Sequence, residues 1–180
     1  MTKLTFKPVT KSTKADFVTL FEGPSAPKYC WCMAWRADKD EVKLPGPKRK
    51  PIMMKRIDAR VPVGLVGYDK GEPVAWVSIA PKDTFRDGLG GPDPQAGETV
   101  WSLVCMFLRR EQRGVGRGHE MIAAAVKYAK KRGATIVEAY PVDPDSPSYR
   151  FMGFVPAYEK AGFKPAGDAG TRRHVMRLQV

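Results

Sequence analysis

The segment from Thr99 to Arg132 constrains the fold most strongly, because it carries three different signals in succession. Thr99–Leu108 is an almost continuous apolar run, the pattern of a strand buried on both faces of a sheet. Arg113–Gly118 follows as a turn with a glycine at every second position. An amphipathic helix then extends to Arg132, and Gly133 is expected to end it. A buried strand, a glycine-rich turn and a long helix in this order indicate an α/β domain with a ligand site at the turn.

The rest of the chain alternates between strand-like and helix-like patterns, without a repeat or a linker. Residues 63–79 have the pattern of a β-hairpin around the turn Asp69–Glu72. The other expected strands are 4–9, 135–140 and 174–178, and the other expected helices are 14–22, 52–60 and 156–161. We therefore expect residues 1–180 to form a single domain of the mixed α/β (α+β) class.

The charge of the chain is strongly positive and unevenly distributed. Lysine and arginine outnumber aspartate and glutamate by 31 to 19, a net charge of +12. Residues 1–60 carry 14 basic and 6 acidic side chains, and residues 109–132 carry 8 and 2. Such an excess favours an anionic partner, such as nucleic acid, an acidic membrane face or a phosphate-rich small molecule. One of the two basic segments surrounds the glycine-rich turn.

Several protein classes are excluded by composition. No apolar run approaches 18 residues, so a membrane-spanning helix is not expected. The first ten residues lack an apolar stretch, and we expect no secretory signal. The three cysteines cannot all pair, which favours reduced thiols and a cytoplasmic location. The cysteines and the two histidines show no zinc-ligand spacing, so we expect no metal.

The glycine-rich turn is suited to binding phosphate. Free N–H groups at the start of a helix, with the helix dipole behind them, attract a phosphate or pyrophosphate, and Arg113 and Arg117 add positive charge. A dinucleotide fingerprint would need its third glycine where His119 or Met121 stands, and no Gly-Lys pair exists for a P-loop. On these residues alone, a turn that merely tightens a loop stays an alternative.

The pattern Arg113-x-x-Gly116-x-Gly118 before a long helix resembles the acetyl-CoA loop of the GNAT N-acetyltransferase superfamily. The strand 105–108 before the loop, the strand 136–140 after the helix and the segment Ala157–Phe163, with its tyrosine and Gly-Phe exit, fit the same family. The resemblance implies a mixed, mostly antiparallel central sheet flanked by helices. It also implies that the strands before and after the loop's helix diverge.

The resemblance further implies a site for acetyl-CoA between strands 101–108 and 135–140. The residues implied to bind the cofactor are Phe107 and Leu108 along the pantetheine arm, and Arg113, Gly114, Val115, Gly116, Arg117 and Gly118 at the pyrophosphate. Tyr158 occupies the position of the family's general acid, and a phenol is protonated at neutral pH. A half-buried tyrosine with an ordinary hydrogen bond is the alternative for this residue. A backbone N–H near Leu108 would hold the oxyanion.

Other parts of the site stay open at this stage. Glu98, Glu138 or a water chain could accept the proton of the amine. Phe151 stands seven positions before the tyrosine, where the family often has a polar residue. The segment Tyr29–Arg36 either fills a corner of the core or lines an apolar acceptor pocket.

The hypothesis with most support is therefore an acetyl-CoA-dependent N-acetyltransferase that acts on a primary amine of a small molecule or protein. A basic RNA- or ribosome-associated protein and a CoA-binding sensor without catalysis are the alternatives, and nucleic acid is the less favoured partner. The sequence does not identify the amine. A homodimer is common among similar proteins, and the oligomeric state stays open.

Overall fold

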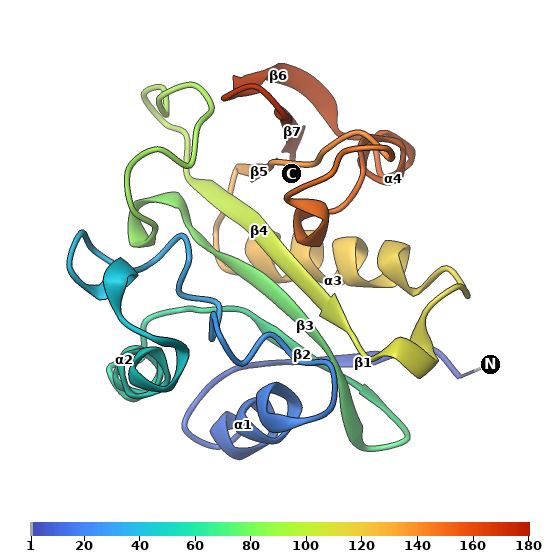
Figure 1. Ribbon diagram of the computed structural model, residues 1–180. Coiled ribbons are helices and arrows are strands. Elements are labelled where there is room, and N and C mark those ends of the chain that lie inside the picture. The colour runs from blue at the N-terminus through green and yellow to red at the C-terminus, as the bar shows by residue number, and fades with distance from the viewer. Residues whose placement is uncertain (1) are drawn as a thin grey trace.

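Seven strands form one sheet in the order β1-β2-β3-β4-β5-β7-β6 in the computed structural model, which describes residues 2–180 (Figure 1). The strands are β1 Thr5–Pro8, β2 Leu65–Asp69, β3 Glu72–Pro81, β4 Val100–Leu108, β5 Ile136–Ala139, β6 Lys164–Ala169 and β7 Arg173–Gln179. The strands β4 and β5 run parallel, and every other neighbouring pair is antiparallel. The predicted mixed, mostly antiparallel sheet is confirmed.

Helices cover both faces of the sheet. They are α1 Lys14–Glu22, α2 Gly46–Asp58, α3 Arg117–Lys131 and α4 Val155–Lys160. Short 3₁₀ turns lie at Glu41–Lys43, Lys82–Thr84, Arg110–Gln112 and Arg150–Met152. Figure 1 shows α1 and α2 on one side of the sheet and α3 on the other. Among the described residues, no helix combines the length and the apolar character needed to cross a bilayer.

The two faces carry separate hydrophobic cores. On the α1 side, Phe17, Phe21 and Trp31 pack against Trp76 of β3, with the Phe17 and Trp76 ring centroids 4.9 Å apart. On the α3 side, the helical spacing of Ile122 and its neighbours buries one face of α3 against β3 and β4. Because β3 and β4 lie between these cores, both are almost entirely apolar.

Two elements differ from the sequence prediction. The helix expected at 52–60 begins earlier, at Gly46, and spans Gly46–Asp58. Pro47 stands in its first turn, where no N–H partner is needed, and the helix accommodates Pro51 further along. The strand β6 was not expected, because Pro165 and Gly167 disfavour strands. An edge strand with an irregular register at Pro165–Gly167 accommodates both residues.

Candidate functional site

The strands β4 and β5 pair along only part of their length. Val100–Leu103 pairs with Ile136–Ala139, and β4 then continues to Leu108, where among residues 2–180 it pairs with β3 alone. The chain leaves β5 after Ala139, and Val142 bridges instead to Phe154 and Arg173. A register shift in the β3–β4 pairing leaves Val104 of β4 without a partner on β3, at the point where the separation from β5 begins. The predicted divergence of the two strands is therefore confirmed.

The glycine-rich turn lies just beyond the free end of β4, at the open end of this divergence. Gly116 is the N-cap of α3 with φ of 80°, and Gly114 has φ of 82°, conformations that glycine adopts without strain. A Cβ added at Gly114, Gly116 or Gly118 would meet no atom within 4 Å, so the outer side of the turn is open. Within residues 2–180, the backbone N–H groups of 115–118 donate no hydrogen bond. The turn thus presents unsatisfied donors to a ligand.

The two arginines of the turn occupy different environments. Arg113 is exposed, and its Nε donates to the Leu108 carbonyl at 2.9 Å, so its charge stays beside the end of β4. Arg117 is only 4% exposed, and its Nη2 pairs with the Asp69 carboxylate at 3.2 Å. Its Nη1 is buried without a partner among the described residues. The Arg117 side chain therefore anchors the start of α3 to the β2–β3 hairpin.

Replacing Asp69 by alanine is expected to lower the free energy of unfolding, because it leaves the buried Arg117 guanidinium without its ion-pair partner. Chemical denaturation measures the change. The matched control is Asp40→Ala, which removes an exposed pair with Lys43 and should change stability by about 0.5 kcal/mol or less. Equal effects of the two variants would contradict an anchoring role for Arg117.

Tyr158 lies on α4 and packs in the core on the α3 side of the sheet. Its ring is fully buried, and its hydroxyl donates to the Met152 carbonyl at 2.9 Å. Gly153 is held tightly between Tyr158 and Met106 of β4, since an added Cβ would lie 2.9 Å from each side chain. Burial raises the pKa of Tyr158, so the phenol is protonated at neutral pH.

The cofactor-contact residues expected on β4 point to opposite faces of the sheet. Phe107 is buried in the core on the α1 side, whereas Leu108 packs against the core on the α3 side. Their backbone lies in the part of β4 that β5 does not pair. Phe151 is 40% exposed, and its ring centroid lies 6.2 Å from that of Tyr149. These two rings form an aromatic surface at the position where the resemblance led us to expect a polar residue.

The two carboxylates considered as bases lie at the paired end of β4 and β5. Glu138 is fully buried beside Ser102, and it accepts hydrogen bonds from Lys82 at 2.8 Å, from Arg177 at 2.6 Å and from Tyr140. Glu98 contacts Arg177 at 3.4 Å. Both carboxylates are thus held in ion pairs away from the open end, which leaves water as the third proton acceptor considered from the sequence.

A buried cysteine cluster faces the divergence from the α1 side, and sequence reasoning did not anticipate it. The Cys32 sulfur accepts hydrogen bonds from Arg36 Nη1 at 3.2 Å and from the Trp76 indole at 3.3 Å. The Cys105 thiol of β4 beside it and the Arg36 charge lower the pKa of Cys32. Trp31 and Cys32 both have positive φ, at 49° and 54°, an arrangement that is held by the surrounding packing.

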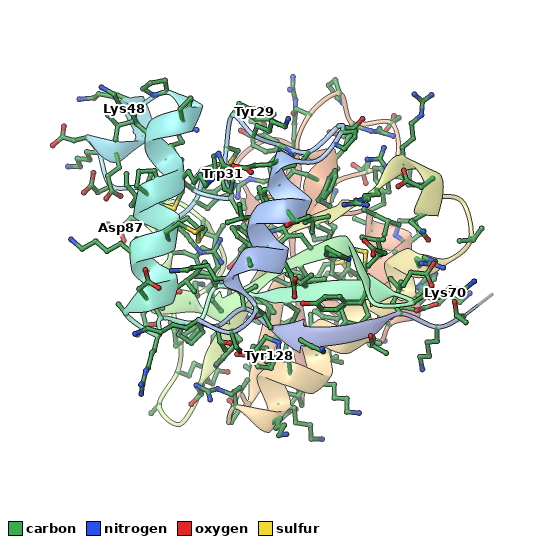
Figure 2. The ribbon with its side chains drawn as sticks, turned by 90° about the horizontal axis from the view of Figure 1, so that it is seen from below. Tyr29, Trp31, Lys48, Lys70, Asp87 and Tyr128 are labelled. Atoms are coloured by element: carbon green, nitrogen blue, oxygen red, sulfur yellow. The ribbon has the colours of Figure 1, made fainter. Side chains whose placement is uncertain are left out.

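The remaining aromatic residues of this segment separate into core and surface. Trp31 and Met33 are buried in the core on the α1 side, as the packing interpretation of the segment predicts. Trp35 is instead half-buried, 6.5 Å from the Tyr149 ring, and the Arg173 guanidinium lies 4.4 Å from the centroid of the Trp35 ring. Figure 2 shows Tyr29 at the surface, and its side chain is 73% exposed. Trp35 and Tyr29 are therefore the aromatic members of this segment that stay accessible at the surface.

The comparisons with known proteins agree with this geometry. A family model described as "Acetyltransferase (GNAT) family" matches residues 27–163. No curated protein matches the chain in sequence.

Three solved structures illustrate the similarity in fold. AAC(6')-Ib in complex with paromomycin and acetyl-CoA has a TM-score of 0.60 at 18% identity, covering 99% of this chain and 94% of that one. A ribosomal-protein-alanine N-acetyltransferase from Brucella melitensis has a TM-score of 0.56 at 14% identity, covering 98% and 99%. The PaiA N-acetyltransferase from Thermoplasma acidophilum, in complex with coenzyme A, has a TM-score of 0.56 at 13% identity, covering 99% and 100%. With a family model that spans most of its length, the chain belongs to the GNAT acetyltransferase family.

Proposed function

We propose that residues 1–180 act as one domain that transfers the acetyl group of acetyl-CoA to a primary amine. The observation that carries this proposal is the position of the open glycine turn, with free N–H groups, at the wide end of the β4–β5 divergence. Structures of similar fold that contain acetyl-CoA or coenzyme A support it.

The backbone of the turn would hold the diphosphate of the substrate. The N–H groups of Val115–Gly118 and of Gly114 are the donors, and the dipole of the 15-residue helix α3 reinforces them. The exposed Arg113 would contribute its charge from the end of β4. The Arg117 guanidinium would act through its anchor on Asp69, which fixes where the helix begins.

The unpaired edge of β4 would align the pantetheine arm. The backbone at Phe107 and Leu108 has no β5 partner, so its polar groups on that edge are available to an extended ligand. Arg113 Nε donates a hydrogen bond to the Leu108 carbonyl, and this bond would break when the pantetheine arm pairs with that carbonyl. A backbone N–H in this stretch would stabilise the negative charge that develops on the carbonyl oxygen.

Tyr158 would supply the proton to the departing thiolate. Its phenol is buried and protonated, and its neighbours Met106 and Gly153 place it beside the unpaired part of β4. The proton of the incoming amine would leave through water, because Glu98 and Glu138 are held in ion pairs at the closed end.

Similar structures are associated with two classes of amine acceptor. One neighbour is in complex with an aminoglycoside, and another is named for acetylating a ribosomal protein, so both small molecules and proteins occur at this fold. The aromatic surface of Trp35, Tyr149 and Phe151 would offer apolar contact to the acceptor.

Calorimetric titration with acetyl-CoA, followed by thiol release with a panel of amines, aminoglycosides and peptides, tests the proposal. We expect binding with a Kd below about 1 mM and thiol release with at least one acceptor class. No binding at that concentration would contradict the proposal. Tight binding without thiol release across the panel would point to a CoA sensor instead.

A further inference from the structure

An open concave surface lies at the β1 edge of the sheet, between α3, β1 and the chain that follows α2. It is an open groove with a volume of about 1240 Å³, and we call it the basic groove. Its side walls carry six exposed cations, which are Lys3, Lys11, Arg60, Lys127, Lys131 and Arg132. Figure 2 shows Tyr128 where α3 borders β1, which marks the position of this groove.

The cations of the basic groove are not neutralised by the protein. Within residues 2–180, none of the six has a carboxylate within ion-pair distance. The one carboxylate that lines the groove, Glu120, accepts a hydrogen bond from the Leu4 backbone N–H at 2.8 Å. The six cations therefore outnumber the one lining carboxylate, and the groove presents a net positive field that selects an anionic occupant.

The floor of the groove distinguishes between kinds of anion. The half-buried rings of Phe6 and Tyr128 line it together with apolar residues of β1 and β2. Tyr128 is supported by an edge-to-face contact with Trp101, with ring centroids 5.5 Å apart. An acidic peptide or a lone phosphate uses the charged walls but not this aromatic floor. Cations beside partly accessible rings are the combination by which proteins bind single-stranded nucleic acid, since phosphates pair with the cations and bases stack on the rings.

We propose that the basic groove is a binding site for single-stranded nucleic acid. The walls contact the phosphates without reading sequence, and Tyr128 and Phe6 stack against bases. Acetyl-CoA would lie at the open turn before α3 and along β4, whereas the groove runs along α3 from His119 in its first turn to Arg132, and none of its lining residues is assigned to the cofactor. The proposal therefore stands independently of acetyl transfer.

Fluorescence anisotropy with a labelled oligouridylate of about 12 nucleotides tests the proposal, a length within the range that single-strand-binding domains cover. We expect a Kd of about 10 μM or lower at about 50 mM salt, and about 50-fold weaker binding at about 200 mM if some four phosphates are neutralised. Lys131→Glu should weaken binding about tenfold. Lys130→Glu, an equal charge reversal on the same helix outside the groove, should change the Kd by less than about twofold.

Several results would overturn the proposal. One is the absence of binding at low salt, and another is an equal loss of affinity in Lys130→Glu and Lys131→Glu. Equal affinity for polyglutamate or for a duplex of matched charge would show that the rings make no contact with bases. Displacement of the oligonucleotide by coenzyme A would assign the groove to the cofactor. Calorimetric titration of both variants with acetyl-CoA should give unchanged affinity.

Discussion

Replacing Tyr158 by phenylalanine is expected to lower turnover about 100-fold while leaving acetyl-CoA affinity within about twofold. The variant removes only the hydroxyl, which is the proton donor proposed for the departing thiolate. The ring stays in its buried site beside Gly153 and Met106, so the shape of the divergence is kept. Steady-state kinetics with the best acceptor, together with calorimetric titration, separate the effect on turnover from the effect on binding.

Tyr140→Phe is the matched control for this variant. Tyr140 is equally buried, and its hydroxyl is hydrogen-bonded to Ser102 and Glu138 at the closed end of the strands. Tyr158→Phe loses one buried hydrogen bond, worth about 1 kcal/mol of stability, and Tyr140→Phe loses two, but only Tyr158→Phe removes the proposed acid. Similar turnover in Tyr158→Phe and the unmodified protein would remove Tyr158 from the mechanism. An equal loss of turnover in both variants would assign the effect to packing.

The second large effect is expected from Gly116→Ala, which should weaken acetyl-CoA binding by at least tenfold. Gly116 has φ of 80° at the N-cap of α3, and alanine in this conformation costs about 1 kcal/mol or more. Relief of that strain would rotate the N–H groups that follow, and the methyl group would project from the open side of the turn toward the ligand. Both changes act where the diphosphate is proposed to bind. Calorimetric titration measures the loss.

Gly71→Ala is the control that separates an effect on acetyl-CoA binding from the effect of backbone strain on stability. Gly71 has φ of 89° in the β2–β3 turn, and an added Cβ there also meets no atom within 4 Å. The two variants should lose similar amounts of stability in thermal denaturation, because each places alanine in the left-handed region. Only Gly116→Ala should lose affinity for acetyl-CoA. Unchanged affinity in Gly116→Ala would place the diphosphate away from the turn.

Much of the fold could be predicted because its signals are local. The central strand is apolar along its whole length, α3 has regular helical spacing, and the turn between them is marked by alternate glycines. The strand β6 could not be predicted in this way. Pro165 and Gly167 are unfavourable to strands in general, and they are tolerated only because β6 lies at the edge of the sheet.

The site was less predictable because its environments come from distant parts of the chain. The inward position of Arg117 depends on Asp69, which lies 48 residues earlier in the sequence. The Cys32 sulfur is surrounded by side chains from β3, β4 and the loop after α1. Neither the spacing of the cysteines nor the composition predicts that these side chains come together. The positions of Phe107, Leu108, Arg113–Gly118 and Tyr158 around the divergence agree with the hypothesis drawn from the sequence, and their roles in catalysis and cofactor binding stay predictions.

The ion cluster at the closed end of the strands limits how the enzyme can move. Glu138 on β5 is tied to Lys82, which follows β3, and to Arg177 on β7, so one carboxylate connects three segments of the sheet. Sliding one strand past another would break both ion pairs in a dry environment, which is energetically costly. The closed end is therefore held by side-chain ion pairs as well as by the strand ladder, whereas Val104–Leu108 of β4 has neither kind of connection to β5.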